Sequence, residues 1–159
     1  MKFQHVKAEE LKGPIKLEGF ADWAGKLQHS PGVTSILMAA APGKGKGSAV
    51  GSLAETLHYD IVRCRLSQLT DYPDPAGEFK AMLQGAEHLR RTVVWLDGLD
   101  RFLARLPDAT VTGQQILEGW LKDERDPLSR NEVLVVATAH QASDLPAPLS
   151  GAFDQTFTG

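Results

Sequence analysis

Short apolar runs alternate along the chain with longer stretches whose apolar residues recur every three or four positions. Glycine, proline or charged residues bound most of the short runs, as is typical of buried strands. We expect strands at 33–39, 60–66, 92–97, 132–138 and 153–157. We expect helices at 18–28, 46–58, 78–91, 99–106 and 112–122. Because strands that alternate with helices favour a parallel sheet, the pattern predicts an α/β fold in three layers, with a five-stranded, mostly parallel sheet and helices on both faces.

The first residues of the chain do not share this pattern. Residues 1–16 are mixed and polar, and Gly13-Pro14 interrupts any regular element. We therefore expect a partly ordered N-terminal arm over residues 1–16 and one domain over residues 17–159. A chain of 159 residues is long enough to bury one core.

The composition is that of an ordinary globular protein, with 42% hydrophobic and 23% charged residues. A net charge of −3 gives no support for binding to nucleic acid or to an anionic membrane surface. No apolar run is long enough to span a membrane, and residues 1–6 are too polar for a secretory signal. We expect a cytoplasmic protein with no membrane role, and the charge disfavours a nucleic-acid partner.

The Gly-rich segment 40–48 is the most specific chemical signal in the chain. It lies between an expected strand and an expected helix, an order that places backbone N–H groups and a helix N-terminus around an anion. The phosphate-binding motif is Gly, four residues, Gly-Lys and then Ser or Thr. Here Ala40 holds the first glycine position and Gly47 holds the hydroxyl position. The candidate nucleotide-binding residues are Pro42, Gly43, Lys44, Gly45, Lys46, Gly47 and Ser48.

A second element supports this interpretation over the alternative of a surface turn that two lysines keep soluble. Four apolar residues, 93–96, are followed by Asp97. In a nucleotide site such a carboxylate faces the phosphate loop and holds Mg²⁺, often through water, so Asp97 is a candidate for both nucleotide and metal binding. Asp97 also fits a solvated residue that caps the next helix. Gly98 stands where a hydrolytic enzyme would place a carboxylate to orient the attacking water.

In their order and spacing these motifs resemble the large nucleotide-binding subdomain of an AAA+ ATPase. Residues 40–47 read Ala-Ala-Pro-Gly-Lys-Gly-Lys-Gly, where the family typically has Gly-Pro-Pro-Gly-Thr-Gly-Lys-Thr. Residues 97–100 read Asp-Gly-Leu-Asp in place of Asp-Glu-Ile-Asp, and residues 137–140 read Ala-Thr-Ala-His in place of Ala-Thr-Thr-Asn. Residues 152–154 read Ala-Phe-Asp in place of Arg-Phe-Asp. The resemblance covers residues 15–158 and implies a P-loop NTPase fold without the family's helical lid.

The resemblance places the departures on positions that carry chemistry, while Lys46 and Asp97 match the phosphate-binding lysine and the Mg²⁺ aspartate. Four family residues are replaced: the Mg²⁺-binding hydroxyl by Gly47, the catalytic glutamate by Gly98, the asparagine near the attacking water by His140, and the arginine finger by Ala152. An arginine finger is worth about 10³–10⁵ in rate in related phosphoryl transfers, so its loss would be severe.

These residues lead to three hypotheses. The first is a degenerate AAA+-like domain whose ATP hydrolysis is lost or strongly impaired, and which serves assembly, partner binding or regulation. Its partners would be other AAA+-type subunits or a regulatory protein. The second is a nucleotide-binding switch that still binds ATP or ADP, with Mg²⁺, but weakly. The substitutions also allow that no nucleotide binds. The third is a slow ATPase that uses Asp100 or His140 in place of the missing glutamate, although His140 equally fits a hydrogen-bonded strand-end residue. The substitutions favour a protein that is not an enzyme.

Overall fold

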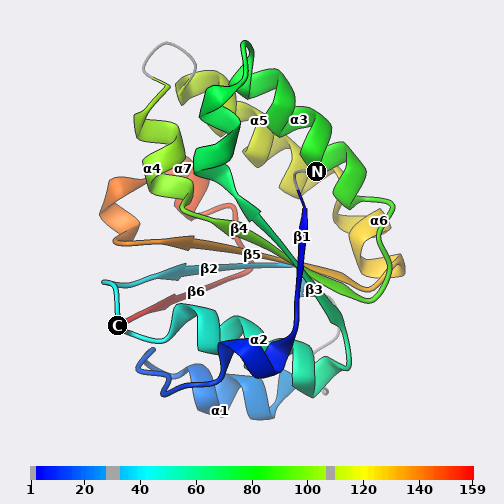
Figure 1. The fold of residues 1–159 in the computed structure, drawn as a ribbon, viewed down its shortest axis with the longest axis vertical. Coiled ribbons are helices and arrows are strands. Elements are labelled where there is room, and N and C mark those ends of the chain that lie inside the picture. The colour runs from blue at the N-terminus through cyan, green and yellow to red at the C-terminus, as the bar shows by residue number, and fades with distance from the viewer. Residues whose placement is uncertain (1–2, 28–32, 107–109) are drawn as a thin grey trace.

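A six-stranded sheet between two layers of helices forms the centre of the computed structural model, which describes residues 3–27, 33–106 and 110–159 (Figure 1). The strands are β1 Gln4–Val6, β2 Ser35–Ala39, β3 Asp60–Arg65, β4 Thr92–Asp97, β5 Val133–Ala139 and β6 Gln155–Thr158. The α-helices are α1 Phe20–Gly25, α2 Lys46–Leu57, α3 Pro75–Ala86, α4 Leu99–Ala104, α5 Thr110–Asp123, α6 Arg125–Arg130 and α7 Ala147–Ser150. Short 3-10 helices are η1 Ala8–Leu11, η3 Leu66–Asp71 and η4 Ala142–Asp144.

The strands lie in the order β1-β3-β4-β5-β2-β6, and every neighbouring pair except β1 and β3 is parallel. The predicted three-layer α/β fold with a mostly parallel sheet is confirmed. Because the carboxyl ends of parallel strands meet at one edge, the segments that follow β2, β4 and β5 come together there. This edge contains the candidate site.

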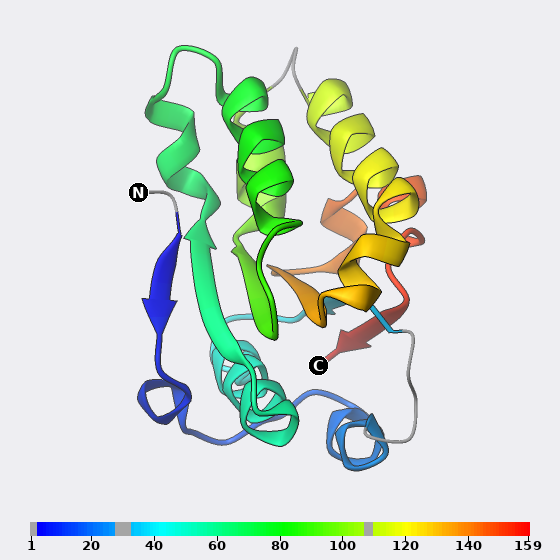
Figure 2. The ribbon, with the colours of Figure 1, turned by 90° about the vertical axis from the view of Figure 1, so that its right-hand side faces the viewer.

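The predicted count of five strands is wrong by one, because β1 adds an antiparallel strand at the edge of the sheet. Gln4 pairs with Arg63 and Val6 with Ile61, so the beginning of the N-terminal arm runs beside β3 (Figure 2). The exposure of Gln4 and His5 explains the miss. Only Val6 is partly buried, so this short strand has no alternating hydrophobic pattern that a sequence can reveal.

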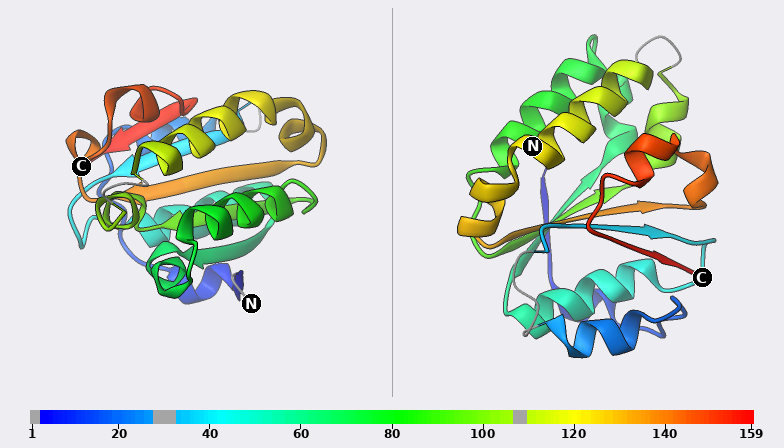
Figure 3. Two further views of the ribbon diagram at one scale, coloured as in Figure 1. Left: turned by 90° about the horizontal axis from the view of Figure 1, so that it is seen from above. Right: turned by 180° about the vertical axis from the view of Figure 1, so that it is seen from behind.

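The helices divide between the two faces of the sheet. Helices α1 and α2 cover one face, and α3 to α7 cover the other (Figures 1 and 3). Along β4, Val93 and Trp95 belong to the core beside α1 and α2, whereas Val94 and Leu96 belong to the core on the opposite side. This alternation follows from the period of two in a strand, and it also places Asp97 on the face that α2 covers.

Helix α6 was not predicted from the sequence, because the segment around it is rich in charge and contains Pro127. Proline is tolerated in the first turn of a helix, where its missing N–H would have no intrahelical partner. The side chain of Leu128 is fully buried and attaches this short helix to the core.

Candidate functional site

The Gly-rich loop lies at the carboxyl edge of the sheet, between the end of β2 and the start of α2. Pro42 and Gly43 form its exposed part. Gly43 and Gly45 have φ of +89° and +83°, in the left-handed region that glycine adopts without strain. Gly45 is the N-cap of the twelve-residue helix α2. The predicted order of strand, loop and helix is present, and the helix N-terminus offers backbone N–H donors to an anion.

Lys46 extends from the first turn of α2 to the ends of β2 and β5. Its Nζ donates to the carbonyl oxygen of Ala40 at 2.5 Å and to that of Ala139 at 2.9 Å. Burial lowers the pKa of Lys46, and the nearby carboxylates of Asp100 and Asp97 oppose this shift. The ammonium group is therefore partly desolvated, and a phosphate close to it would stabilise its charged form.

Asp97 ends β4 close to Lys46, but its carboxylate is already paired. Arg63, on the neighbouring strand β3, donates from Nε and Nη2 to Asp97 Oδ2, at 2.9 and 2.5 Å. The other oxygen, Oδ1, accepts from the hydroxyl of Thr138 at 3.3 Å. The guanidinium group also lies over the ring of Trp95, with Cζ 4.3 Å from the ring centroid, in a stabilising cation–π contact. Asp97 is thus held by side chains from the two neighbouring strands, β3 and β5.

Trp95 fills the space next to Gly47. A Cβ added to Gly47 would lie 3.2 Å from Cη2 of Trp95, a tight contact that requires the indole to shift slightly. The indole Nε1 donates to Thr138 Oγ1 at 3.1 Å, which fixes the ring. Mg²⁺ needs a nearly octahedral set of oxygen ligands at about 2.0–2.1 Å. With no hydroxyl at Gly47 and with Asp97 paired to Arg63, the residues present do not fit a Mg²⁺ site.

Asp100 and His140, the two candidates for catalysis, lie together at the ends of β4 and β5. Asp100 is only 8% exposed, and its Oδ2 accepts from the backbone N–H of His140 at 3.1 Å. Its Oδ1 is buried without a hydrogen-bond partner among the described residues. The ring Nε2 of His140 lies 3.3 Å from Nη2 of Arg101. Asp100 therefore positions the segment after β5, whereas the ring of His140 contacts a side chain that follows β4.

The N-terminal arm lies against the Gly-rich loop, which the sequence did not predict. The backbone N–H of Lys16 donates to the carbonyl oxygen of Lys44 at 2.8 Å. A Cβ added to Gly45 would lie 2.2 Å from the carbonyl oxygen of Pro14, so only glycine allows this approach. The arm forms one wall of the candidate site.

Ser48 faces the same arm from the first turn of α2. Together with Lys12, Gly13 and Ile15 of the arm and further residues of α2, it lines an open cavity of about 350 Å³. The cavity extends along α2 beside the arm, and the residues that line it do not include Gly43, Gly45 or Lys46.

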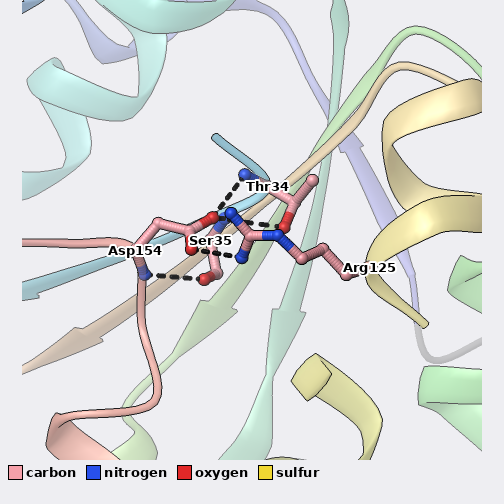
Figure 4. Close-up of polar contacts among 4 residues, drawn as sticks. All are labelled: Thr34, Ser35, Arg125 and Asp154. Carbon is pink, nitrogen blue, oxygen red and sulfur yellow. Dashed lines mark hydrogen bonds and ion pairs between the residues drawn. The ribbon is translucent and has the colours of Figure 1, made fainter. Parts of the chain in front are cut away.

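The segment that includes Ala152 and Asp154 lies at the opposite, amino edge of the sheet, where β2 and β6 begin (Figure 4). Asp154 Oδ2 accepts from the backbone N–H of Thr34 at 2.8 Å and from that of Ser35 at 3.3 Å, and Oδ1 pairs with Arg125. Burial alone would raise the pKa of Asp154, but the hydrogen bonds from Thr34 and Arg125 outweigh it and lower the pKa. Asp154 therefore joins β6 to β2, while Ala152 packs against the core.

Three residues of the site escaped the sequence analysis: Arg63, Trp95 and Thr138. Arg63 interrupts the apolar residues of its strand, and this was the one available signal. The register of β3 against β4 places Arg63 directly beside Trp95, and the register of β4 against β5 places Asp97 beside Thr138. Such pairings between distant segments are visible only once the strand order is known.

Two further classes of site find no support within residues 3–27, 33–106 and 110–159. No three or more His, Cys, Asp and Glu side chains gather there in a way that could hold a metal ion. No helix in this part of the chain is long and apolar enough to cross a membrane.

Comparison with known proteins agrees with this geometry. The model of the ATPase family associated with various cellular activities (AAA) matches residues 36–158. The AAA domain of FIGL-1, solved in complex with ADP, is similar in fold, with a TM-score of 0.64 and 15% identity over 94% of this chain and 50% of that one. The T158V variant of RuvB from Thermotoga maritima has a TM-score of 0.65 and 18% identity, over 96% of this chain and 47% of that one. The chain thus spans about half the length of each solved structure. No curated protein is significantly similar to it in sequence.

Proposed function

The chain belongs to the AAA family of ATPases, and on that premise we propose that it is a degenerate member in which ATP hydrolysis is lost or strongly impaired. Its role is then assembly, partner binding or regulation. The partners are other AAA-type subunits or a regulatory protein, and the compartment is the cytoplasm.

One observation carries this proposal: the carboxylate of Asp97 is bound to Arg63 where the family would use it to hold Mg²⁺. Gly47, at the start of α2, has no hydroxyl, and a Cβ there would make a tight contact with Trp95. Gly98 offers no carboxylate, and its φ of +84° belongs to a conformation that disfavours any other residue. These differences all affect hydrolysis, and they leave the glycine turn and Lys46 in place.

The proposal is tested by phosphate release from ATP in the presence of Mg²⁺, with Lys46→Ala as the matched control. We expect wild type and variant to release phosphate at the same background rate. A wild-type rate well above that of Lys46→Ala would overturn the proposal, because this lysine would then support turnover.

A nucleotide-binding switch is the second candidate, and the turn from Gly43 to Lys46 favours it. The residues that would hold ATP or ADP are those of segment 42–48, together with the basic and acidic groups near Lys46. One solved structure with this fold contains ADP, which supports the same class of ligand here. Binding would be weak, since the first glycine of the motif is Ala40.

A thermal-shift titration with ATP and ADP tests the switch. Ligand at about 100 times its dissociation constant adds about 2.7 kcal/mol to stability, so a working site raises the melting temperature. We expect a rise in wild type that is lost in Lys46→Ala. Absence of a rise at millimolar nucleotide would exclude the switch and leave the domain as a scaffold.

A slow ATPase based on Asp100 or His140 is the third candidate. Both residues lie at the strand ends near Lys46, which favours it. Against it, Asp100 is buried and already accepts the His140 N–H. This candidate requires Lys46-dependent turnover that disappears in Asp100→Asn or in His140→Ala while the melting temperature stays close to that of wild type.

Partner binding has one surface feature in its favour. Tyr72, in the segment between η3 and α3, is 40% exposed and is the most exposed large hydrophobic side chain among the described residues. Light scattering across a range of concentrations, with and without ATP, tests self-assembly. A Tyr72→Ser variant that assembles as wild type does would exclude this side chain from the contact.

A further inference from the structure

The positively charged guanidinium group of Arg63 lies directly beside the carboxylate of Asp97. Arg63 reaches the carboxylate with two N–H donors on a single oxygen, and the Trp95 ring supports the guanidinium group from one face. About three quarters of each side chain of the ion pair is covered, since Arg63 is 23% exposed and Asp97 is 27% exposed. A charge pair that is this well shielded is screened less by salt than a surface pair.

We infer that Arg63 takes the place of the divalent cation in this site, so that a nucleoside di- or triphosphate binds here in its metal-free form. The inference rests on the proposed nucleotide site and names the form of its ligand. A divalent cation at Asp97 would have to displace the guanidinium group of Arg63 or lie beside it. Two positive charges in contact repel each other strongly in a partly buried site.

The other carboxylate near Lys46 does not restore a metal site. Asp100 uses one oxygen to accept the His140 N–H, and its second oxygen is buried. Mg²⁺ is usually bound through one or two carboxylates together with water and substrate phosphates, in a nearly octahedral arrangement. Gly47 supplies no oxygen from its side chain, and Trp95 occupies the adjoining space.

The same residues suit a phosphate that carries no metal. Lys46 supplies an ammonium group, α2 supplies the donors of its N-terminus, and Arg63 supplies a second fixed positive charge near Asp97. Two of the five N–H groups of a guanidinium contact Asp97, and a planar guanidinium suits phosphate oxygens as well as carboxylates. In other phosphate sites a metal ion provides part of the positive charge, whereas here the side chains of Lys46 and Arg63 provide it.

Isothermal titration calorimetry with ADP and ATP, in EDTA and in MgCl₂, tests the inference. We expect the wild-type dissociation constant to be about fivefold or more larger in MgCl₂ than in EDTA, because Mg²⁺ in solution competes with the protein for the metal-free nucleotide. An affinity that is unchanged or higher in MgCl₂ would overturn the inference.

Arg63→Met is the decisive variant, because its unbranched side chain can still pack on Trp95 while the positive charge is removed. It frees Asp97, so we expect binding in EDTA to weaken and Mg²⁺ to improve it about fivefold or more. Arg90→Gln removes an exposed arginine before β4, at the opposite edge of the sheet, and should behave as wild type. A folded Arg63→Met variant that binds equally well in both buffers would overturn the inference.

A separate experiment distinguishes failure of this inference from failure of the nucleotide site. If neither nucleotide binds in any buffer, the switch is excluded, and Mn²⁺ binding measured by electron paramagnetic resonance decides the metal question alone. Wild-type protein that takes up no Mn²⁺ at Asp97 then supports only the exchange of the cation for Arg63, and the absence of nucleotide binding overturns the rest of the inference. Mn²⁺ binding to wild type that disappears in Asp97→Asn overturns it.

Discussion

An aspartate paired with an arginine stands at each edge of the sheet, and the two pairs differ in what surrounds them. At the amino edge, Asp154 accepts from two backbone N–H groups as well as from Arg125, and it joins the first residues of β2 and β6. At the carboxyl edge, Asp97 is held only by side chains, those of Arg63 and Thr138.

This difference indicates that Asp154 has a structural role and that Asp97 has a role in ligand binding. Backbone donors at Thr34 and Ser35 are buried and need an acceptor, so Asp154 stabilises the fold whatever the domain does. Asp97 is more exposed than Asp154. Its partners are side chains, so they can change rotamer while the backbone of their strands stays in place. We therefore expect substitutions at the amino edge to act on stability and substitutions at the carboxyl edge to act on ligands.

Of the two aspartates, Asp154 should have the larger effect on stability when it is replaced by alanine. The substitution leaves the backbone N–H groups of Thr34 and Ser35 buried without their acceptor, which we expect to lower the free energy of unfolding by about 3 kcal/mol. Asp97→Ala, with no backbone donor to leave unpaired, should lower it by about 1 kcal/mol. Urea unfolding measures both, and equal losses would contradict the contrast.

Gly45→Ala and Gly43→Ala form a matched pair within the carboxyl edge. Both glycines have positive φ, so each substitution costs about 1 kcal/mol in backbone strain. Only at Gly45 does the new Cβ meet the Pro14 carbonyl, at 2.2 Å. We expect Gly45→Ala to lose about 2 kcal/mol more than Gly43→Ala in urea unfolding, because a backbone contact cannot relax easily. Equal losses would show that the N-terminal arm does not lie on the loop.

The lowered pKa of Asp154 gives the amino edge a dependence on pH. Its unfolded-state value is near 3.8, so its ionised form stabilises the protein fully above that pH. This stability is lost as the pH falls below 3.8 through the pKa of the folded state. We expect the advantage of wild type over Asp154→Asn in free energy of unfolding to shrink across this acidic range. An advantage that stays constant with pH would contradict the assignment.

Gly98→Glu restores the family's glutamate in sequence but not in geometry. The φ of +84° makes any side chain unfavourable, so we expect a loss of about 1 kcal/mol and no gain in phosphate release. Gly98→Ala should lose the same amount, because a Cβ there meets no atom within 4 Å. Turnover in Gly98→Glu that Lys46→Ala abolishes would show that the carboxylate alone was missing.

Lys46→Ala should have the smallest effect on stability and a large effect on ligand binding. Burial lowers the pKa of Lys46, which means that folding disfavours its charged form, and this offsets the hydrogen bonds it makes. We expect the free energy of unfolding to change by less than about 1 kcal/mol. Any rise in melting temperature caused by nucleotide should vanish. A large loss of stability without ligand would indicate a structural lysine.

Much of the fold could be predicted because its signals are local. The runs that became β2, β4 and β5 are apolar and end next to glycine or polar residues, and the loop before Lys46 has a recognisable motif. Strand β1 and helix α6 were not predicted, because each is stabilised by contacts with segments that are distant in the sequence. Gln4 pairs with Arg63, and Leu128 inserts into a core formed by other elements.

The part of the candidate site that depends on local sequence motifs could also be predicted. Motif order identified Lys46, Asp97, Asp100 and His140, which the structure places at one edge of the sheet. It could not identify Arg63 as the partner of Asp97, because that contact depends on the register of two strands more than thirty residues apart.

The fate of ATP bound to the protein tests the central claim most directly. Wild type and Lys46→Ala are each dialysed to equilibrium against ATP and MgCl₂. The amounts of ATP and ADP on the protein side are then measured by chromatography over several hours. The account predicts that any Lys46-dependent excess of nucleotide remains ATP and that ADP stays at the level of the variant. Accumulation of ADP with wild type but not with Lys46→Ala would contradict it.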